Sequence, residues 1–421
     1  MLAKQLLIRC GRLIDGTGGP VQNDVTLHLA HDLVDRIEPG IASPPPPEAT
    51  VIDARDRTVL PGLMDLHVHL VNGVTDPREP HILFGMLQST TQMLTLWATR
   101  NVRMLLEAGF TTIRDVSSFM NPGNPEVLAL RDAVQLGLVP GPRIVAGGWI
   151  SQTAGHRDVF LPRNWVRDPT YLADGPWEIR KVIRRMVRDG VDLIKTSTSG
   201  GAGGHGEEIW WRNWTDEELA VLVDESHAYG KRVASHAHSA DSVKRAVRAG
   251  VDTIEHGIYM DDEAIELLAK QGGTLVPTLA ARSERAISHR RKSGSPPHVM
   301  RKFEAAQAAG TSSFKKAHEA GVVIAMGTDT GRGLREYFGK NAYELTLMVE
   351  AGLTPMESIV AATRNAARAL GREEDLGTLE PGKQADLLVV DGNPLDDITL
   401  LEDQGRIKLV MCAGRVAVER S

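Results

Sequence analysis

Eight short, mostly apolar runs, most of them with polar or ionisable residues near their end, dominate the middle of this 421-residue chain. Segments of helical length, among them residues 216–229, 240–249 and 340–351, lie between or after these runs. The runs occupy residues 63–69, 111–116, 143–148, 192–198, 232–237, 253–257, 274–279 and 323–329. Strands that alternate with helices form parallel sheets. Eight such units predict an α/β fold, a closed (β/α)8 TIM barrel whose active site lies at the carboxyl ends of the strands.

Two β-rich segments flank this middle region. The first sixty residues contain strand-like runs at residues 4–10, 24–29 and 50–54, separated by turn sequences such as DGTGGP. The last fifty residues hold similar runs at residues 385–392 and 406–419. We expect the two ends to meet in one small β-sandwich domain. The predicted domains are residues 1–60 with 370–421 for the composite sandwich and residues 61–369 for the catalytic barrel.

The overall composition narrows the class of protein. Hydrophobic residues make up 42% and charged residues 24% of the chain, which is typical of a soluble globular enzyme. Basic residues number 48 against 54 acidic ones, a net charge of −6, so no nucleic-acid partner is expected. No stretch approaches the roughly 18 uninterrupted apolar residues of a membrane span, so no membrane partner is expected. The two cysteines, Cys10 and Cys412, exclude a framework of several disulfides but allow one bridge.

The N-terminal sequence MLAKQLLIRCGRLIDG has no long apolar run followed by a small-residue cleavage site. We therefore expect a cytoplasmic protein, although a signal peptide removed from a precursor would leave no trace in this sequence. Its expected partners are a small-molecule or dipeptide substrate and further copies of the same chain in a homo-oligomer.

Two histidines at the end of the first run form the first candidate metal-binding pair. Residues i and i+2 of a strand point to the same side, so His67 and His69 are able to bind one metal ion together. Leu60-Pro61-Gly62 turns the chain into the barrel just before them. Polar residues then recur at the same end of run after run, which packing alone does not explain. The pattern favours a functional site over two solvated histidines.

The later runs supply further candidate ligands. Lys195 lies near the end of the fourth run, where a buried ammonium close to cations would be costly. It is either paired with a nearby carboxylate or converted by carbon dioxide to a carbamate, an anion able to bridge two metal ions. Imidazole and carboxylate groups suit Zn²⁺ and similar ions. With His67 and His69, the following groups make a two-metal set: Lys195, a histidine of Ser235-His236-Ala237-His238, His256 and Asp329.

These motifs resemble the amidohydrolase superfamily over nearly the whole chain. The similarity rests on PGLMDLHVH, the lysine of the fourth run, SHAH, IEHG, GTDTG and GTLEPGKQADLLVVDGNP. Within the superfamily, the chain is most similar to Xaa-Pro and related dipeptidases, imidazolonepropionase-like proteins and ochratoxin-hydrolysing amidohydrolases. The resemblance implies two divalent metal ions, with zinc as the expected metal, and a carboxylated Lys195 as their bridging ligand.

The resemblance also assigns roles to individual residues. His67 and His69 would hold the more buried ion, and His236 and His256 would hold the second. Asp329 would be both a metal ligand and the general acid/base. His236 matches the family motif better than His238, which would lie behind the ligands and is a candidate for substrate binding.

The predicted ligand set indicates hydrolysis of an amide-like bond. A hydroxide bridging two cations is nucleophilic near neutral pH, and one cation polarises the scissile carbonyl. Asp329 would accept the proton of that hydroxide and return it to the leaving nitrogen. The resemblance to dipeptidases and ochratoxin hydrolases favours an amide bond to a C-terminal amino acid, in a dipeptide, an N-acyl amino acid or an ochratoxin-like substrate.

Three alternatives stay open at this point. A cyclic-amide hydrolase, such as an imidazolonepropionase, is the hardest to separate from an amidase of amino acids. A mononuclear deaminase is disfavoured by Lys195 and by His236-Ala237-His238, where deaminases usually carry a glutamate. A non-catalytic scaffold would have no need of several polar groups that converge on one place.

Residues outside the ligand set are candidates for substrate binding. His156, in SQTAGHRD after the third run, and Arg332, after the eighth, are predicted to contact a substrate carboxylate. Gly200–Glu207 lacks the Gly-Lys-Ser/Thr ending of a phosphate loop and is expected to form a mobile loop over the site. Three tryptophans follow this loop: Trp210, Trp211 and Trp214. They predict either a helix-packing cluster or an aromatic wall for a substrate side chain.

Overall fold

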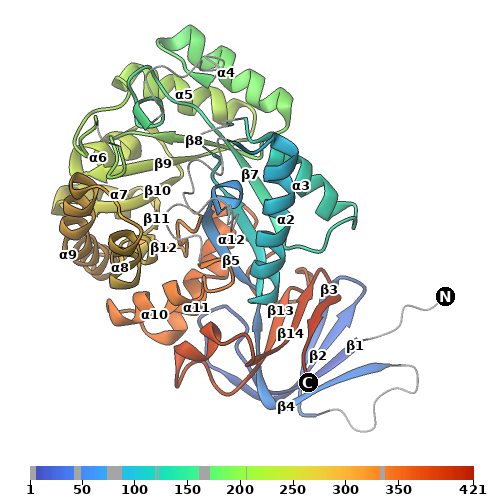
Figure 1. Cartoon of the computed structure of the whole chain (residues 1–421). Helices are drawn as coiled ribbons and strands as arrows, with labels where there is room; N and C mark the ends of the chain where they lie inside the picture. Colours follow the sequence, from blue (N-terminus) through green and yellow to red (C-terminus); the bar gives the residue numbers. More distant parts are fainter. Residues whose placement is uncertain are drawn as a thin grey trace.

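The structure is a computed structural model that describes residues 6–41, 49–73, 88–118, 121, 123–160, 171–204, 206–331 and 337–421. An eight-stranded parallel sheet forms a barrel, and a seven-stranded mixed sheet contains strands from both ends of the chain (Figure 1). The predicted fold class, a (β/α)8 barrel with a β module built from the two termini, is confirmed. The exact domain boundaries stay a prediction.

The barrel strands follow one another around the ring in chain order. They are β5 (Leu63–Val68), β6 (Phe110–Asp115), β7 (Arg143–Trp149), β8 (Leu193–Ser197), β9 (Arg232–Ser239), β10 (Thr253–Tyr259), β11 (Thr274–Val276) and β12 (Val323–Ile324). Each of the eight predicted runs overlaps one of them. The segment after β12 closes the ring, because Leu66 N donates to Met326 O at 3.0 Å and Asp329 N donates to His67 O at 2.7 Å.

Helices connect the strands and cover the outside of the barrel (Figure 1). They are α2 (Thr91–Glu107), α3 (Pro125–Gln135), α4 (Pro176–Asp189), α5 (Asp216–Ala228), α6 (Ala240–Ala249), α7 (Asp262–Lys270), α8 (Glu284–Lys292), α9 (Pro297–Glu319), α10 (Tyr343–Glu350), α11 (Pro355–Ala361) and α12 (Arg364–Leu370). Local sequence sets their ends. Ser239 caps α6 by accepting a hydrogen bond from Ser242 N, and Gly250 ends it in the left-handed region. His236 and His238 therefore occupy the last residues of β9 before the chain turns outward.

The terminal sheet joins the two ends of the chain. Its order is β15 (Arg415–Glu419), β14 (Ile407–Cys412), β13 (Leu387–Asp391), β4 (Thr50–Pro61), β1 (Leu6–Leu13), β2 (Gln22–Ala30) and β3 (Leu33–Pro39). β4 pairs with β1 in parallel and with β13 in antiparallel orientation, so N- and C-terminal strands lie side by side (Figure 1). Residues of β2 and of β14 share one apolar core, which requires the sheet to fold over on itself. Cys10 and Cys412 are both free thiols.

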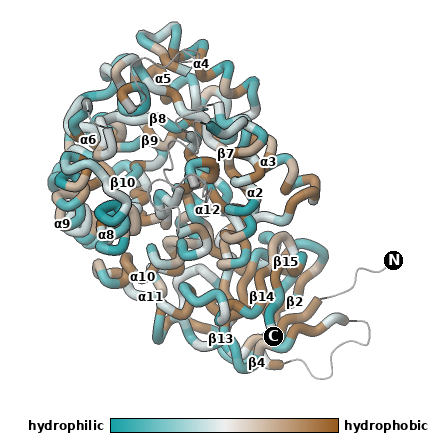
Figure 2. Tube along the Cα trace, viewed as in Figure 1, coloured by the Kyte–Doolittle hydropathy of each residue, from teal (hydrophilic) through white to brown (hydrophobic). Residues whose placement is uncertain are grey.

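Hydrophobic residues concentrate along the strands of the terminal sheet, whereas an outer helix such as α8 is hydrophilic (Figure 2). The largest apolar core lies between the barrel strands and their helices. Within the described residues, we find no helix with the length and apolar character of a membrane span. The carboxyl ends of the barrel strands differ from both cores, because buried polar side chains gather there.

Candidate metal centre

The site begins with β5 and the segment that follows β12. His67 lies on β5, His69 follows directly after its last residue, and both are buried. Asp329 Oδ1 lies 3.2 Å from His69 Nε2 and 3.7 Å from His67 Nε2. The backbone bonds that close the barrel bring these groups together, because His69 N donates to Thr330 O at 2.8 Å, beside the bond between Asp329 N and His67 O.

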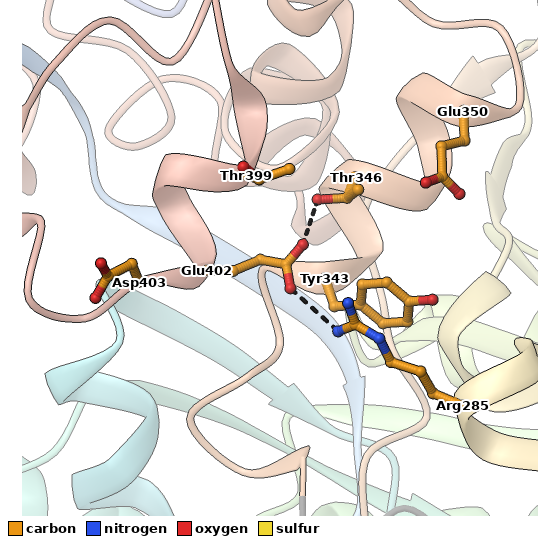
Figure 3. Close-up of a pocket in the computed structure, with 7 residues that line it drawn as sticks. All are labelled: Arg285, Tyr343, Thr346, Glu350, Thr399, Glu402 and Asp403. Carbon is orange, nitrogen blue, oxygen red and sulfur yellow. Dashed lines mark hydrogen bonds and ion pairs between the residues drawn. The ribbon is translucent and has the colours of Figure 1, made fainter. Parts of the chain in front are cut away.

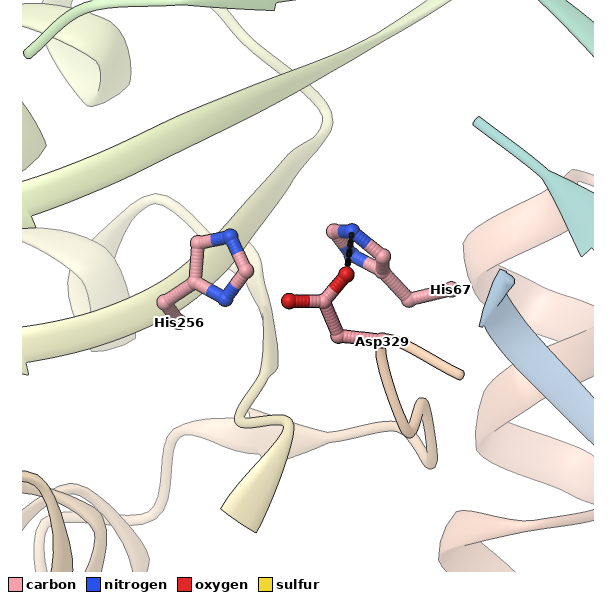
Figure 4. A group of neighbouring side chains, drawn as sticks. All are labelled: His67, His256 and Asp329. Carbon is pink, nitrogen blue, oxygen red and sulfur yellow. Dashed lines mark ion pairs between the residues drawn. The ribbon is translucent and has the colours of Figure 1, made fainter. Parts of the chain in front are cut away.

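His256 completes a group of side chains able to hold a metal ion (Figure 4). One ligand atom each from His67, His256 and Asp329 lie within 4.8 Å of one another. His256 and Asp329 have φ values of 76° and 59°, in the left-handed region that non-glycine residues rarely adopt. Strained backbone of this kind gathers at functional sites. Imidazoles with a carboxylate are a donor set that fits zinc and similar ions.

The imidazole rings are oriented by their Nδ1 atoms. His67 Nδ1 lies 2.6 Å from Glu255 Oε2, and His69 Nδ1 lies 2.5 Å from Ser117 O. His256 Nδ1 lies 2.7 Å from Thr278 Oγ1. When Nδ1 carries the proton, Nε2 keeps a lone pair. Partners of this kind fix the tautomer and aim of histidines that bind metals.

Burial and nearby positive charge keep His67, His256 and His238 neutral. Burial first, and then the positive charge of Lys195, lower the pKa of His67 to about 4. Burial also lowers the pKa of His256 and of His238, with neighbouring cationic groups adding to the effect. Neutral imidazole is the form that binds a metal ion. The rings of His67, His256 and His238 are thus neutral at neutral pH.

Lys195, His236 and His238 belong to the same cluster. Lys195 is buried on β8, and its charge acts on both His67 and His256. The ring centroid of His236 lies 4.7 Å from that of His256 and 4.1 Å from that of His238. The structure therefore brings all six predicted ligands to one end of the barrel, while their assignment to individual ions stays a prediction.

His156 stands at the edge of this cluster. Its ring stacks on His236 with centroids 4.4 Å apart, and its Nδ1 lies 2.7 Å from Glu207 Oε2. Glu207 also accepts hydrogen bonds from Gly201 N at 2.7 Å and Gly204 N at 3.0 Å. The glycine-rich segment is thus tied to the site by a buried carboxylate that the sequence analysis missed. The predicted mobility of this loop stays untested.

The three tryptophans and Arg332, the other residues predicted near the substrate, do not form one group in the structure. Trp214 is buried and donates from Nε1 to Thr196 Oγ1 at 2.9 Å, so it packs beside β8. Trp210 and Trp211 are exposed, at 66% and 46%, which argues against a packing cluster of all three. An aromatic wall stays a prediction. Arg332 lies outside the described residues.

Three charged residues that support the ligands also escaped the sequence analysis. Asp65 accepts from His67 N at 3.0 Å and Thr328 N at 3.1 Å, which links β5 to the closing segment. Arg114 donates to Glu255 at 2.8 Å across the barrel. Burial alone would raise the pKa of Glu255, but Arg114 and His67 outweigh it and lower that pKa. The sequence contains a signal for two of these three residues, because each lies next to a candidate ligand. Asp65 precedes His67 by two residues, and Glu255 directly precedes His256.

A parallel barrel with neutral histidines and a carboxylate at the carboxyl ends of its strands is the arrangement of a metal-dependent hydrolase. The model of the amidohydrolase family matches residues 58–417, and the chain belongs to that family.

Individual relatives span almost the whole chain. The crystal structure of a Xaa-Pro dipeptidase with bound methionine in the active site aligns with a TM-score of 0.89 and 35% identity, over 98% of this chain and 99% of the other. An ochratoxinase of Aspergillus niger is 29% identical over 98% of this chain and 87% of its own. An imidazolonepropionase of Geobacillus thermodenitrificans is 25% identical over 93% and 86% of the two chains.

Proposed function

We propose that this amidohydrolase uses two divalent metal ions, zinc being expected, to hydrolyse the amide bond between an acyl group and an amino acid with a free carboxylate. Such substrates are dipeptides, N-acyl amino acids and ochratoxin-like conjugates. The observation that carries the proposal is the buried group of His67, His256 and Asp329, whose ligand atoms lie within 4.8 Å of one another. The rings of His69 and His236 lie beside this group.

The proposed ligand assignment follows the strands. His67, His69 and Asp329 would hold one ion, and His236 and His256 would hold the other. Lys195 would bridge them as a carbamate: its ammonium first loses one proton, Nζ then forms a bond to the carbon of carbon dioxide, and the nitrogen loses a second proton. The burial of Lys195, whose charge acts on His67 and His256, supports this reaction, because it exchanges a cation for an anion next to the proposed metal positions.

The chain's own groups would then carry the proton transfers. Bound divalent ions supply Lewis acidity, which lowers the pKa of water and polarises a carbonyl. Asp329, at 3.2 Å from His69 Nε2, stands where it is able to accept a proton from the attacking water. It would pass that proton to the leaving nitrogen, which departs as the free amine. Glu255 and Thr278 would hold the rings of His67 and His256 in place.

The relatives support the choice of substrate class. The matched dipeptidase holds methionine, an amino acid, in its active site. The ochratoxinase is a second relative named for its hydrolytic substrate, and it covers nearly the whole chain. An enzyme that releases amino acids by cleaving an amide fits both. His156 and His238, which border His236, stay the proposed substrate-binding side chains, with His156 placed to contact the substrate carboxylate.

The test is a substrate panel with defined metal content. Protein stripped by a chelator should be inactive, and Zn²⁺ should restore hydrolysis of N-acyl amino acids and dipeptides. The same panel should include an imidazolone ring and an aminated heteroaromatic ring. Turnover of the imidazolone ring alone would assign a cyclic-amide hydrolase, and release of ammonia from the aminated ring would assign a deaminase. Either result would contradict the proposal.

A further inference from the structure

The loop that follows β8 contacts the ring of His236, a proposed ligand of the second metal ion. Gly200 O lies 3.2 Å from Nε2 of His236. A carbonyl oxygen only accepts hydrogen bonds, so Nε2 of His236 carries the proton in this contact and Nδ1 keeps the lone pair. A carbonyl or carboxylate on the ring nitrogen that faces away from the metal is the usual way of orienting a metal-binding histidine. The carbonyl of Gly200 therefore sets the tautomer and the direction of this ring.

A single peptide group links this carbonyl to Glu207. The carbonyl of Gly200 and the N–H of Gly201 belong to the same planar unit, and they point in opposite directions in a trans peptide. Gly201 N donates to Glu207 Oε2 at 2.7 Å, while Gly200 O faces His236. Because the unit is rigid, a displacement of the Glu207 carboxylate should rotate it and move the carbonyl away from the histidine ring.

Glu207 is held on several sides. Its side chain is buried, and each of its two oxygens has a donor. Oε1 accepts from Gly204 N at 3.0 Å, and Oε2 lies 2.7 Å from His156 Nδ1 in addition to its bond from Gly201 N. The side chain of Lys302, on α9, donates to Glu207 O. Backbone and carboxylate of this residue are thus both fixed.

The glycines of the loop let its backbone pack directly against these side chains. A Cβ atom on Gly201 would lie 2.1 Å from His156 Cε1, and one on Gly204 would lie 2.3 Å from Glu207 Oε1. Any side chain at either position would push the imidazole or the carboxylate aside. Gly206 differs, because a Cβ atom there would meet no atom within 4 Å apart from its chain neighbours in the described structure.

A second contact runs from Glu207 to the face of the same histidine ring. His156, the partner of Glu207, stacks on His236 with ring centroids 4.4 Å apart and planes inclined by 19°. The carboxylate therefore acts on His236 at an edge, through the peptide group, and on a face, through His156. A carboxylate that served only to close the loop would need neither contact.

We infer that Glu207 is a positioning residue for the proposed metal ion held by His236 and His256. The inference rests on the proposed function and deepens it, because it makes the occupancy of one of the two metal positions depend on the loop after β8. Loss of an orienting partner of a ligand typically lowers metal affinity about 10- to 100-fold.

The other proposed metal position takes its orienting partners from different segments. Glu255, on β10, holds the ring of His67, and the carbonyl of Ser117, after β6, holds the ring of His69. Changes at Glu207 should therefore weaken the binding of one ion and spare the other. That asymmetry separates a positioning role from a general loss of folding, which would weaken both.

The experiment perturbs the carboxylate in two independent ways. Glu207→Met keeps the bulk of the side chain and removes both acceptors, whereas Glu207→Gln keeps one oxygen that is able to accept from Gly201 N. Gly204→Ala displaces the carboxylate without changing it, because the new Cβ atom would lie 2.3 Å from Oε1. Gly206→Ala is the matched control for this substitution, since it adds the same methyl group to open space.

Glu402→Met is the control for the loss of a carboxylate that has partners. Glu402 accepts a hydrogen bond from Thr346 Oγ1 at 2.6 Å and pairs with Arg285 at 3.2 Å. These residues line a separate surface pocket of about 420 Å³ (Figure 3). None of the residues that line this pocket is a proposed metal ligand.

Equilibrium dialysis of metal-free protein against Zn²⁺ buffered by a chelator measures the affinity of each ion without turnover. The wild type and both controls should bind two ions. In Glu207→Met and Gly204→Ala, one ion should bind about 10- to 100-fold more weakly and the other with wild-type affinity. Glu207→Gln should lose less. Anomalous scattering at the zinc edge from crystals of Glu207→Met should place the weaker peak beside His236.

The outcomes separate this inference from the proposed function. Wild-type affinity for both ions in Glu207→Met, or an equal loss of both, overturns the positioning role and leaves the proposed function standing. Selective loss of one ion in a protein that hydrolyses no amide supports the positioning role and refutes the proposed function. A wild-type protein that binds a single ion contradicts both. If Glu207→Met does not fold, Gly204→Ala decides by the same criteria.

Discussion

The two ends of the barrel strands carry opposite kinds of contact. At the amino end of β6 and β7 the terminal sheet packs against the barrel. A Cβ atom on Gly109 would lie 2.9 Å from Leu388 Cδ1, and Arg143 pairs with Asp386 at 2.7 Å. At the carboxyl end, buried histidines and Lys195 lie with Asp329, whose charge acts on Arg282. The amino end joins the two sheets through packing and an ion pair, whereas the carboxyl end gathers ionisable side chains around the candidate metal centre.

The two ends of the barrel therefore have different roles: contacts at the amino end stabilise the fold, and side chains at the carboxyl end form the candidate site. Holding the backbone of Thr278, a β-branched residue, and of Asp329 in the left-handed region costs of order 1–3 kcal/mol each. The chain accepts that strain beside the candidate metal centre. In the terminal sheet, apolar residues alternate on paired strands and bury their side chains in a shared core. Changes to the sheet should therefore affect folding, and changes to the rim should affect activity.

The largest expected effect comes from breaking the amino end. Deleting residues 375–421 removes β13, the antiparallel partner of β4. It also removes the core residues Leu387, Val389, Leu409 and Met411. Each such side chain contributes about 1.5–3 kcal/mol, so the loss approaches the whole stability of a domain, about 5–15 kcal/mol. We expect insoluble protein in a fractionation assay. A soluble and active truncation would show that the two ends share no essential core.

The next effect tests the carboxyl end without unfolding the protein. Asp329→Asn should keep the fold and much of the metal but lower kcat by about 10²- to 10⁴-fold, because the variant cannot accept a proton. Asp391→Asn is the control in the terminal sheet, where Asp391 pairs with Arg57 at 2.9 Å. The control should cost at most about 1 kcal/mol in unfolding free energy and leave kcat unchanged. Near-full kcat of Asp329→Asn across pH would place the general base elsewhere.

The smallest expected effect is a pH dependence of the unfolding free energy that comes from Glu344, at the carboxyl end of the barrel. Burial raises the pKa of Glu344 from 4.5 to about 8, although hydrogen bonds from Ala280 N and Leu279 N oppose the shift. A raised folded pKa means that the folded state holds the proton more tightly. Its stabilising contribution is complete below about pH 4.5 and is lost as the pH rises to about 8. Each pH unit in that window changes stability by at most about 1.4 kcal/mol.

Urea unfolding at several pH values measures this contribution. Glu344→Gln, which does not titrate, should have a flatter pH dependence between about pH 4.5 and 8 than the wild type. The same slope in both proteins would mean that Glu344 stays ionised in the fold.

The sequence predicts the barrel, and the gathering of the candidate ligands at one end of it, because both leave a local signal. A strand buried on both faces is a continuous apolar run, and most of the runs carry a polar group near their end. All eight runs overlap strands, and the candidate ligands His67, His69, Lys195, His236, His256 and Asp329 lie at one end of the barrel. Supporting groups leave a weaker signal. Glu255 is recognisable only beside His256, since its partner Arg114 lies on a distant strand.

Residues in loops are the part that sequence reasoning does not reach. Glu207 acts through a turn that places its oxygens beside Gly201, Gly204 and His156, and no periodicity marks such a position. Arg282 follows Leu279-Ala280-Ala281, which reads as an ordinary helical turn. Its burial comes from α9, whose Gly310 lies against the guanidinium. That burial depends on contact between segments distant in the chain.

The central claim is that the buried cluster is a two-metal centre bridged by a carboxylated Lys195. A crystal structure of the zinc-loaded protein, with anomalous scattering measured at the zinc edge, tests it most directly. We predict two anomalous peaks, one beside His67, His69 and Asp329 and one beside His236 and His256, with continuous electron density beyond Lys195 Nζ. A single peak, or a bare Lys195 amine with both ions bound, would contradict the account.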